Sequence, residues 1–223
     1  MNRIFAFAVF SVILILVHKV QGATIHWGNA PFDTLVKSDG SAGFDAGTTG
    51  QLGYFDGLVP DSSNTANWQS SFRVFDQGNF STSNSYFTGS ANLNGSQNSD
   101  SPNANPSTVF PENAQAYVWI SNGGVSGSTS TEWALLTNAA WDFPNGATHA
   151  GTALEWKVSD TGTVAVFGDL GDQTTPGVGT MMEPGGPFTI QTATFPIPEP
   201  SASLLLLLGT ALLCSRRHRE TFS

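Results

Sequence analysis

Leu154–Ser159 (LEWKVS) shows the clearest structural pattern in the chain. Apolar residues occupy its first, third and fifth positions and polar residues the others, which is the period of two expected for a half-buried strand. Asp160–Gly162 (DTG) is typical of a turn, and it leads into the apolar run Thr163–Phe167 (TVAVF). We therefore predict two strands joined as a hairpin.

Gln115–Ser121 (QAYVWIS) is apolar on both faces of a strand. Ala116, Val118 and Ile120 share one face and two aromatic residues share the other, which predicts a central strand covered on both sides. A further strand candidate follows at Glu132–Thr137 (EWALLT), and weaker candidates lie at Thr24–Trp27, Gln51–Phe55, Phe72–Asp76, Tyr86–Ala91 and Phe188–Ala193. The middle of the chain shows no helical period. Roughly eight or nine short strands favour an all-β fold, an antiparallel β-sandwich or a jelly-roll-like domain.

Three stretches between these strands are expected to be loops. Ala91–Pro111 (ANLNGSQNSDSPNANPSTVFP) is polar and of low complexity. We predict a long loop here rather than an interdomain linker, because neither flank is rich enough in apolar residues for a separate core. The glycine-rich stretches Ser38–Gly50 and Gly168–Gly186 are predicted surface loops. Residues 23–196 are therefore expected to form one β-rich domain.

Charge and cysteine content exclude several classes of protein. The chain has 223 residues, a single Cys and a net charge of −9. Lys37, Arg73 and Lys157 are the only basic residues between 23 and 200. A disulfide scaffold, a Cys-based zinc site and a basic nucleic-acid-binding surface are excluded. Cys214 lies near the C-terminus, so the exported domain must be stabilised by its core rather than by disulfides.

The N-terminus has the pattern of a secretory signal peptide at 1–22. Arg3 precedes an uncharged, apolar run from Ile4 to Val17, and small residues suited to cleavage follow it. This run is too short to span a bilayer as a helix, which takes about 20 residues. We therefore expect signal peptidase to cleave between Gly22 and Ala23, and the mature protein to be exported.

A second apolar run, 201–215, lies near the C-terminus and is rich in leucine. The basic tail 216–219 follows it and contains Arg216, Arg217 and Arg219. An apolar run followed by a basic cluster predicts a short C-terminal membrane helix whose tail stays in the cytoplasm. Its shortness suits a segment that stays in the inner membrane only transiently.

Pro198-Glu199-Pro200 stands directly before that apolar run. The two prolines fix φ and prevent helix or sheet pairing, which leaves an extended strip accessible to a protease beside the membrane. The tripeptide, the apolar run and the basic tail, in this order at 197–219, resemble a PEP-CTERM sorting signal. The resemblance implies recognition by exosortase, an integral-membrane cysteine protease. It also implies delivery to the cell surface or extracellular matrix of Gram-negative bacteria that make exopolysaccharide.

Catalytic and metal-binding motifs are not found. HExxH, GxSxG and Walker A patterns are absent from the sequence, so no catalytic residue, metal ligand or cofactor is assigned. His26 and His149 are far apart in the chain and are expected to be ordinary histidines. Acidic residues in glycine-rich loops could bind Ca²⁺ through their oxygens, although they match neither the EF-hand loop nor the glycine-rich calcium repeat. These residues, which we expect to be solvated, are Asp33, Asp39, Asp45, Asp56, Asp61, Asp169 and Asp172.

Acidic residues beside tryptophans suggest a carbohydrate site. The pairs are Glu132–Trp133, Trp141–Asp142 and Glu155–Trp156. Indole rings can stack on sugar rings while carboxyl groups perform acid–base chemistry, but the alternation around Trp156 places that side chain in the core. We therefore expect a structural or adhesive protein associated with exopolysaccharide, and not an enzyme. A lectin-like carbohydrate-binding module is the alternative, and a glycan hydrolase is a lesser one.

Overall fold

The structure is a computed structural model that describes residues 22–31, 33–41, 47–81, 86–122, 132–149, 151, 153–172 and 188–194. The predicted signal peptide up to residue 21 and the sorting signal lie outside these residues. The sorting-signal residues concerned are Pro198, Glu199, Pro200, Arg216, Arg217 and Arg219. In the described part, no helix is long and apolar enough to cross a membrane.

The all-β composition predicted from the sequence is confirmed. The described residues form twelve strands, and their helical segments are a 3-10 turn, η1 (Thr65–Asn67), and one α-helical turn, α2 (Trp68–Ser71). The strands are β1 (Ala23–Gly28), β2 (Thr34–Val36), β3 (Thr48–Phe55), β4 (Phe72–Asn79), β5 (Thr88–Leu93), β6 (Gln115–Asn122), β7 (Glu132–Asp142), β8 (Ala153–Lys157), β9 (Thr163–Phe167), β10 (Asp169–Asp172), β11 (Phe188–Gln191) and β12 (Ala193–Thr194).

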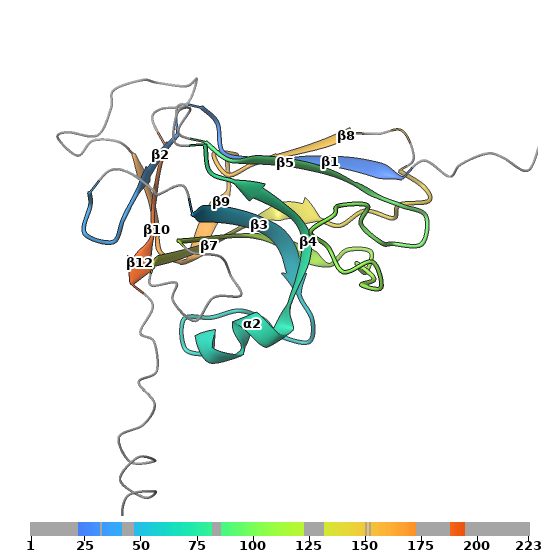
Figure 1. Cartoon of the computed structure of the whole chain (residues 1–223), viewed down its shortest axis with the longest axis horizontal. Coiled ribbons are helices and arrows are strands. Elements are labelled where there is room, and N and C mark those ends of the chain that lie inside the picture. Colours follow the sequence, from blue (N-terminus) through green and yellow to red (C-terminus); the bar gives the residue numbers. More distant parts are fainter. Residues whose placement is uncertain are drawn as a thin grey trace, which may run out of the picture.

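These strands make three sheets. The outer sheet has the order β5-β1-β8, and the large sheet has the order β12-β7-β6-β3-β4 with β9 also paired to β7. A small sheet has the order β10-β11-β2. Figure 1 shows the outer sheet as one layer over the large sheet, with α2 on the opposite side of the large sheet. The large sheet is therefore covered on both faces.

The strand pairing is mixed, and the prediction of antiparallel pairing throughout is wrong. β8 lies parallel to β1, and β11 lies parallel to β2. The other pairs are antiparallel. Both parallel pairs join strands that are far apart in the chain, where no tight turn fixes their relative direction.

The predicted hairpin of β8 and β9 is also wrong. β8 pairs with β1 in the outer sheet, whereas β9 pairs with β7 in the large sheet. Asp160 shapes the turn between them: its carboxylate accepts a hydrogen bond from the Lys157 N–H (2.9 Å), and its N–H donates to the Lys157 carbonyl (2.9 Å). Asn138 of β7 holds the far end of the turn, because its amide donates to the Thr161 carbonyl and to the Thr163 hydroxyl (3.1 Å each). The chain therefore changes sheet at this turn.

β6 is the central strand that the sequence predicted. It lies between β3 and β7 in the large sheet. Ala116, Val118 and Ile120 belong to the core between the two main sheets, where Trp156 of β8 is also buried. Trp119 faces the other way, into a second cluster of buried aromatic residues. The face assigned to Trp156 from its alternation is therefore confirmed.

Trp68 of α2 covers the second cluster. Its ring is fully buried and lies edge-on to Trp119 (centroids 5.6 Å apart) and stacked on Trp133 (6.3 Å). Its indole N–H donates to the side-chain oxygen of Asn64 (2.7 Å), which fixes the turn that carries it. One helical turn thus protects the outer aromatic face of the large sheet.

The polar stretch 91–111 begins as the end of β5 and continues as a loop that joins the two main sheets. Asp100 accepts two hydrogen bonds from Asn92 of β5, one from its N–H and one from its side-chain amide (2.7 Å each). Next to it, the Ser99 hydroxyl donates to the carbonyl of Phe75 in β4 (2.6 Å). Phe110 is fully buried at the other end of the loop. The Asn and Ser residues that give this stretch its low complexity are therefore structural.

Three strands lie wholly or partly in regions that were predicted as loops or left unassigned. β10 lies within the predicted loop Gly168–Gly186, and β3 begins at Thr48 within Ser38–Gly50. β2 has three residues and carries no prediction. β2 and β10, with three and four residues, are too short for a period of two to be recognised.

Candidate functional site

The outer sheet carries a polar surface on the face directed away from the core. Strand register brings three residues together in each of its rows. The rows are Asn92–Thr24–Ala153, Ser90–His26–Glu155 and Thr88–Gly28–Lys157. All the side chains except Thr24, which is half-buried, are exposed, and the backbone of Gly28 is buried.

A hollow of about 270 Å³ lies on this surface over Gly28. Gly28 lines it together with His26, Pro31, Thr88, Glu155 and Lys157. The backbone at this position requires glycine. Gly28 has φ of +145°, and a Cβ at this position would collide with the carbonyl oxygen of Phe87. The end of β1 beside the hollow can therefore take this backbone conformation only with glycine.

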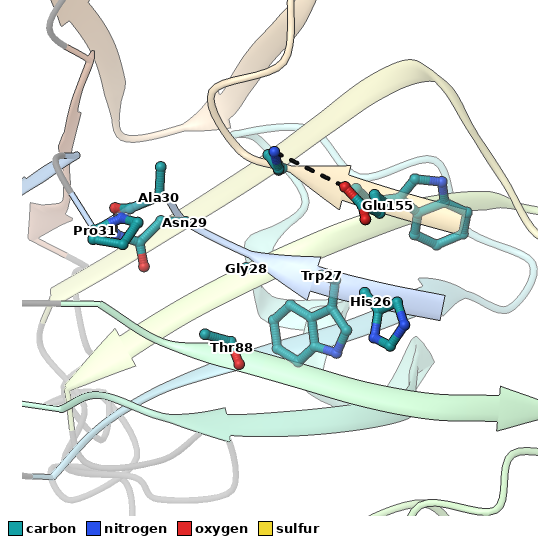
Figure 2. A pocket seen from close by; sticks show the side chains of 10 residues that line it. His26, Trp27, Gly28, Asn29, Ala30, Pro31, Thr88 and Glu155 are labelled. Atoms are coloured by element: carbon teal, nitrogen blue, oxygen red, sulfur yellow. Dashed lines mark hydrogen bonds and ion pairs between the residues drawn. The ribbon is translucent and has the colours of Figure 1, made fainter. Parts of the chain in front are cut away.

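Three separate segments of the chain form the walls of the hollow. Figure 2 shows Thr88 on one side of β1 and Glu155 on the other, with His26 toward one end of the hollow and Pro31 toward the other. Thr88 comes from β5 and Glu155 from β8. The polar groups converge only because both strands pair with β1.

Pro31 is held in place by its neighbours in the chain. The Asn29 side-chain oxygen accepts a hydrogen bond from the Phe87 N–H (2.8 Å), and the Asn29 N–H donates to the Phe87 carbonyl (3.2 Å). The Ala30 N–H donates to the buried carboxylate of Asp33 (2.7 Å), and the Asp33 N–H returns a bond to the Ala30 carbonyl (3.0 Å). These bonds fix this wall before any ligand binds.

Two residues of opposite charge, Lys157 and Glu155, lie beside each other at the edge of the hollow. The Lys157 ammonium lies 3.9 Å from the Glu155 carboxylate, and both side chains are largely exposed, at 57% and 68%. At this distance and exposure the pair contributes little to stability. Both groups remain accessible to a ligand.

The remaining carbohydrate candidates from the sequence do not form a site. Trp133 and Trp141 are buried in two different clusters. Glu132 and Asp142 stand at opposite ends of β7, which has eleven residues, and a strand of that length spans roughly 35 Å. These two carboxyl groups are therefore too far apart to act together in glycoside hydrolysis, which needs about 5–10 Å.

Candidate metal ligands are likewise dispersed. In the described ranges, no group of three or more His, Cys, Asp or Glu side chains is arranged to hold a metal ion. Asp39 and Asp61 accept hydrogen bonds from the N–H of Ser41 (2.9 Å) and of Ser63 (2.8 Å), as turn residues do. Asp56 pairs with Arg73 at 3.2 Å. Asp45 lies outside the described residues.

His26 and His149 lie in different settings. His26 borders the hollow on β1. His149 follows a turn after β7, where its ring lies 3.4 Å from the Thr148 hydroxyl.

No protein-family model, curated protein or solved structure matches this chain.

Glu132 holds the last described strand to the rest of the domain. Its carboxylate accepts hydrogen bonds from the Thr192 hydroxyl (2.6 Å) and from the hydroxyl and N–H of Ser38 (2.6 and 3.0 Å). Partial burial raises the pKa of Glu132, but the hydrogen bonds from Ser38 and Thr192 outweigh it, so the pKa is held below its ordinary value. The ionised carboxylate therefore joins the strands around β12.

We expect Glu132→Gln to lower the free energy of unfolding by about 1 kcal/mol at pH 7, because the amide is a weaker acceptor for three donors. Since the pKa of Glu132 is lower in the folded chain, its contribution is complete above about pH 5 and is lost as the pH falls through the folded pKa. The stability difference between wild type and variant should therefore shrink toward pH 3. Urea unfolding at several pH values measures it. Asp142→Asn, at the exposed end of the same strand, is the control, and an equal loss there would contradict the assignment.

Proposed function

We propose that the chain is an exported surface or extracellular-matrix protein, sorted by a PEP-CTERM-like signal, with a structural or adhesive role and no catalytic activity. One observation carries the proposal. Pro198-Glu199-Pro200, the apolar run 201–215 and the basic tail 216–219 follow in order, directly after a folded β domain whose last described strand ends at Thr194. The proposed partners are signal peptidase and an exosortase-type membrane protease. The proposed route passes through the inner membrane to the cell surface.

The attachment of β12 supports a load-bearing role. Ala193 pairs with Trp133 at the edge of the large sheet, and the Thr192 N–H donates to the Val36 carbonyl (3.1 Å). A pulling force on a C-terminal anchor would act on the domain first at Thr194. The contacts of Thr192, Ala193 and Glu132 would transmit this force to the large sheet and to β2. A domain held at the cell surface by its C-terminus needs such a connection.

The core supports the same proposal. An exported domain without disulfides must be stabilised by its packing. Two buried aromatic clusters, one on each face of the large sheet, provide this packing. We propose that the outer and large sheets form a β-sandwich or a jelly-roll-like domain, and that 201–215 forms the short membrane helix of the unprocessed chain.

Replacing Pro198-Glu199-Pro200 with three alanines tests the sorting proposal. The variant strip becomes able to form helix and loses the charge of Glu199, so unprocessed chain should accumulate in the membrane fraction. Immunoblots of fractionated native host cells measure this. The control is triple-alanine replacement of Glu220-Thr221-Phe222, which should be processed like wild type. Normal processing and display of the Pro198–Pro200 variant would overturn the proposal.

A lectin-like carbohydrate-binding module is the second candidate function. The observation that favours it is the preformed hollow on the outer sheet, with polar side chains from three strands around an apolar floor. The glycan hydrolase alternative lacks such support, because Glu132 and Asp142 lie at opposite ends of β7.

A further inference from the structure

We propose that the hollow over Gly28 binds one uncharged hexose residue of a polysaccharide. The inference rests on the second candidate function, carbohydrate binding, and is independent of how the chain is sorted. It is carried by the size of the hollow, the chemistry of its rim and the flat polar surface that continues from it.

The size of the hollow suits a single ring. Its volume is about 270 Å³. Pockets for drug-sized ligands begin at about 300 Å³. A six-membered ring with its hydroxyl groups therefore fits within it.

The polar groups around the hollow favour an uncharged ligand that carries hydroxyl groups. Lys157 donates hydrogen bonds, Glu155 accepts them, and Thr88 can do both. Because the charges of Lys157 and Glu155 stand 3.9 Å apart, an anionic or cationic ligand gains from one and loses to the other. A hydroxyl group is both donor and acceptor, so it can bond to each of them.

The floor and one wall suit the other face of a sugar. Gly28 presents backbone carbon at the bottom of the hollow, and Pro31 presents its ring at one end. Sugar rings carry C–H groups that pack against such apolar surface. The bonds from Asn29 and Asp33 hold the Pro31 segment in position, so little ordering is needed on binding.

The surface beyond the hollow has room for the rest of a glycan chain. His26, Ser90 and Asn92 are exposed along the outer sheet next to it. The sheet lies at the outside of the domain in Figure 1. A residue within a long polymer can therefore enter the hollow while its neighbours extend over β1 and β5.

Binding of uncharged polysaccharides to the purified full-length chain tests the proposal. The probes are dextran, galactan and mannan, with alginate as the anionic comparison, and the chain is kept in a detergent without a sugar headgroup. We expect at least one uncharged probe to retard the protein in affinity electrophoresis. Thr88→Val should weaken that retardation about tenfold, since it removes a hydrogen bond to the sugar. Glu155→Gln should weaken it several-fold, since it replaces a charged acceptor by a weaker neutral one. Glu112→Gln and Lys37→Met, outside the hollow, are the matched controls and should bind like wild type.

Each result of this experiment decides the proposal. Retardation by none of the uncharged probes, or equal retardation of wild type and hollow variants, would overturn it. Binding to alginate alone, lost in Lys157→Met, would overturn the uncharged ligand while leaving carbohydrate binding intact. Loss of all binding would not touch the sorting proposal, because the triple-alanine experiment measures processing and not affinity.

Discussion

Gly89→Ala is expected to lower the free energy of unfolding by about 3–5 kcal/mol, the sum of overpacking and a damaged buried hydrogen bond. Gly89 lies opposite Trp27 in the outer sheet. A Cβ at this position would collide with the indole nitrogen of Trp27 and with the carboxylate of Asp76. These two groups share a hydrogen bond of 2.8 Å that joins the outer sheet to the large sheet.

The bond matters because Asp76 is a buried carboxylate. Asp76 is only 5% exposed to solvent. It accepts one hydrogen bond from Trp27 and one from the Ser101 hydroxyl (2.6 Å). Moving the Trp27 donor away leaves the buried charge underpaired, which is costly in a core.

Thermal unfolding of the full chain, followed by tryptophan fluorescence, measures the effect of Gly89→Ala. Gly171→Ala is the control, because Gly171 also lies in a strand but a Cβ there meets no atom within 4 Å. The two variants should differ by many degrees in melting temperature. Equal melting temperatures would show that the outer sheet can shift to make room, and that Gly89 does not set the distance between the sheets.

Sequence periodicity predicted which face of a strand is buried better than it predicted which strands pair with each other. The two faces of β6 and the inward side of β8 follow from alternation, because alternation reports directly which side is buried. The pairing partner of β8 does not follow from alternation. β1 precedes β8 by more than a hundred residues, and nothing in Leu154–Ser159 distinguishes a parallel partner from the next strand along the chain.

The hollow could not be predicted for the same reason. Thr88 and Glu155 meet across β1 only through long-range pairing. Gly28 also lines the hollow, and a single glycine at the end of a strand is an ordinary turn signal. In the sequence, Glu155 is a candidate only because of the tryptophan beside it. The structure buries that tryptophan and leaves Glu155 on the opposite face, beside Lys157.

Trp68→Ala is the second substitution with a large expected effect, about 3–5 kcal/mol lost from the free energy of unfolding. Trp68 is fully buried, and its ring touches several aromatic neighbours at once. The centroid distances are 5.9 Å to Phe55, 5.6 Å to Trp119, 6.3 Å to Trp133 and 5.8 Å to Phe167. Truncation creates a cavity beneath a segment that contains only one turn of α-helix.

The position of this cavity determines what else should change. Removing Trp68 also deletes its hydrogen bond to Asn64, so the cover formed by η1 and α2 should detach from the large sheet before the rest of the domain unfolds. Urea unfolding followed by near-ultraviolet circular dichroism should then lose its single transition, because the aromatic signal of Trp119 and Trp133 changes first. Val59→Ser, at an 81% exposed position in the same segment, is the control and should unfold like wild type. A Trp68→Ala variant with wild-type stability and one sharp transition would mean that the outer face of β6 does not need this cover. The burial of both faces of the central strand would then contribute far less to the fold than its sequence and packing indicate.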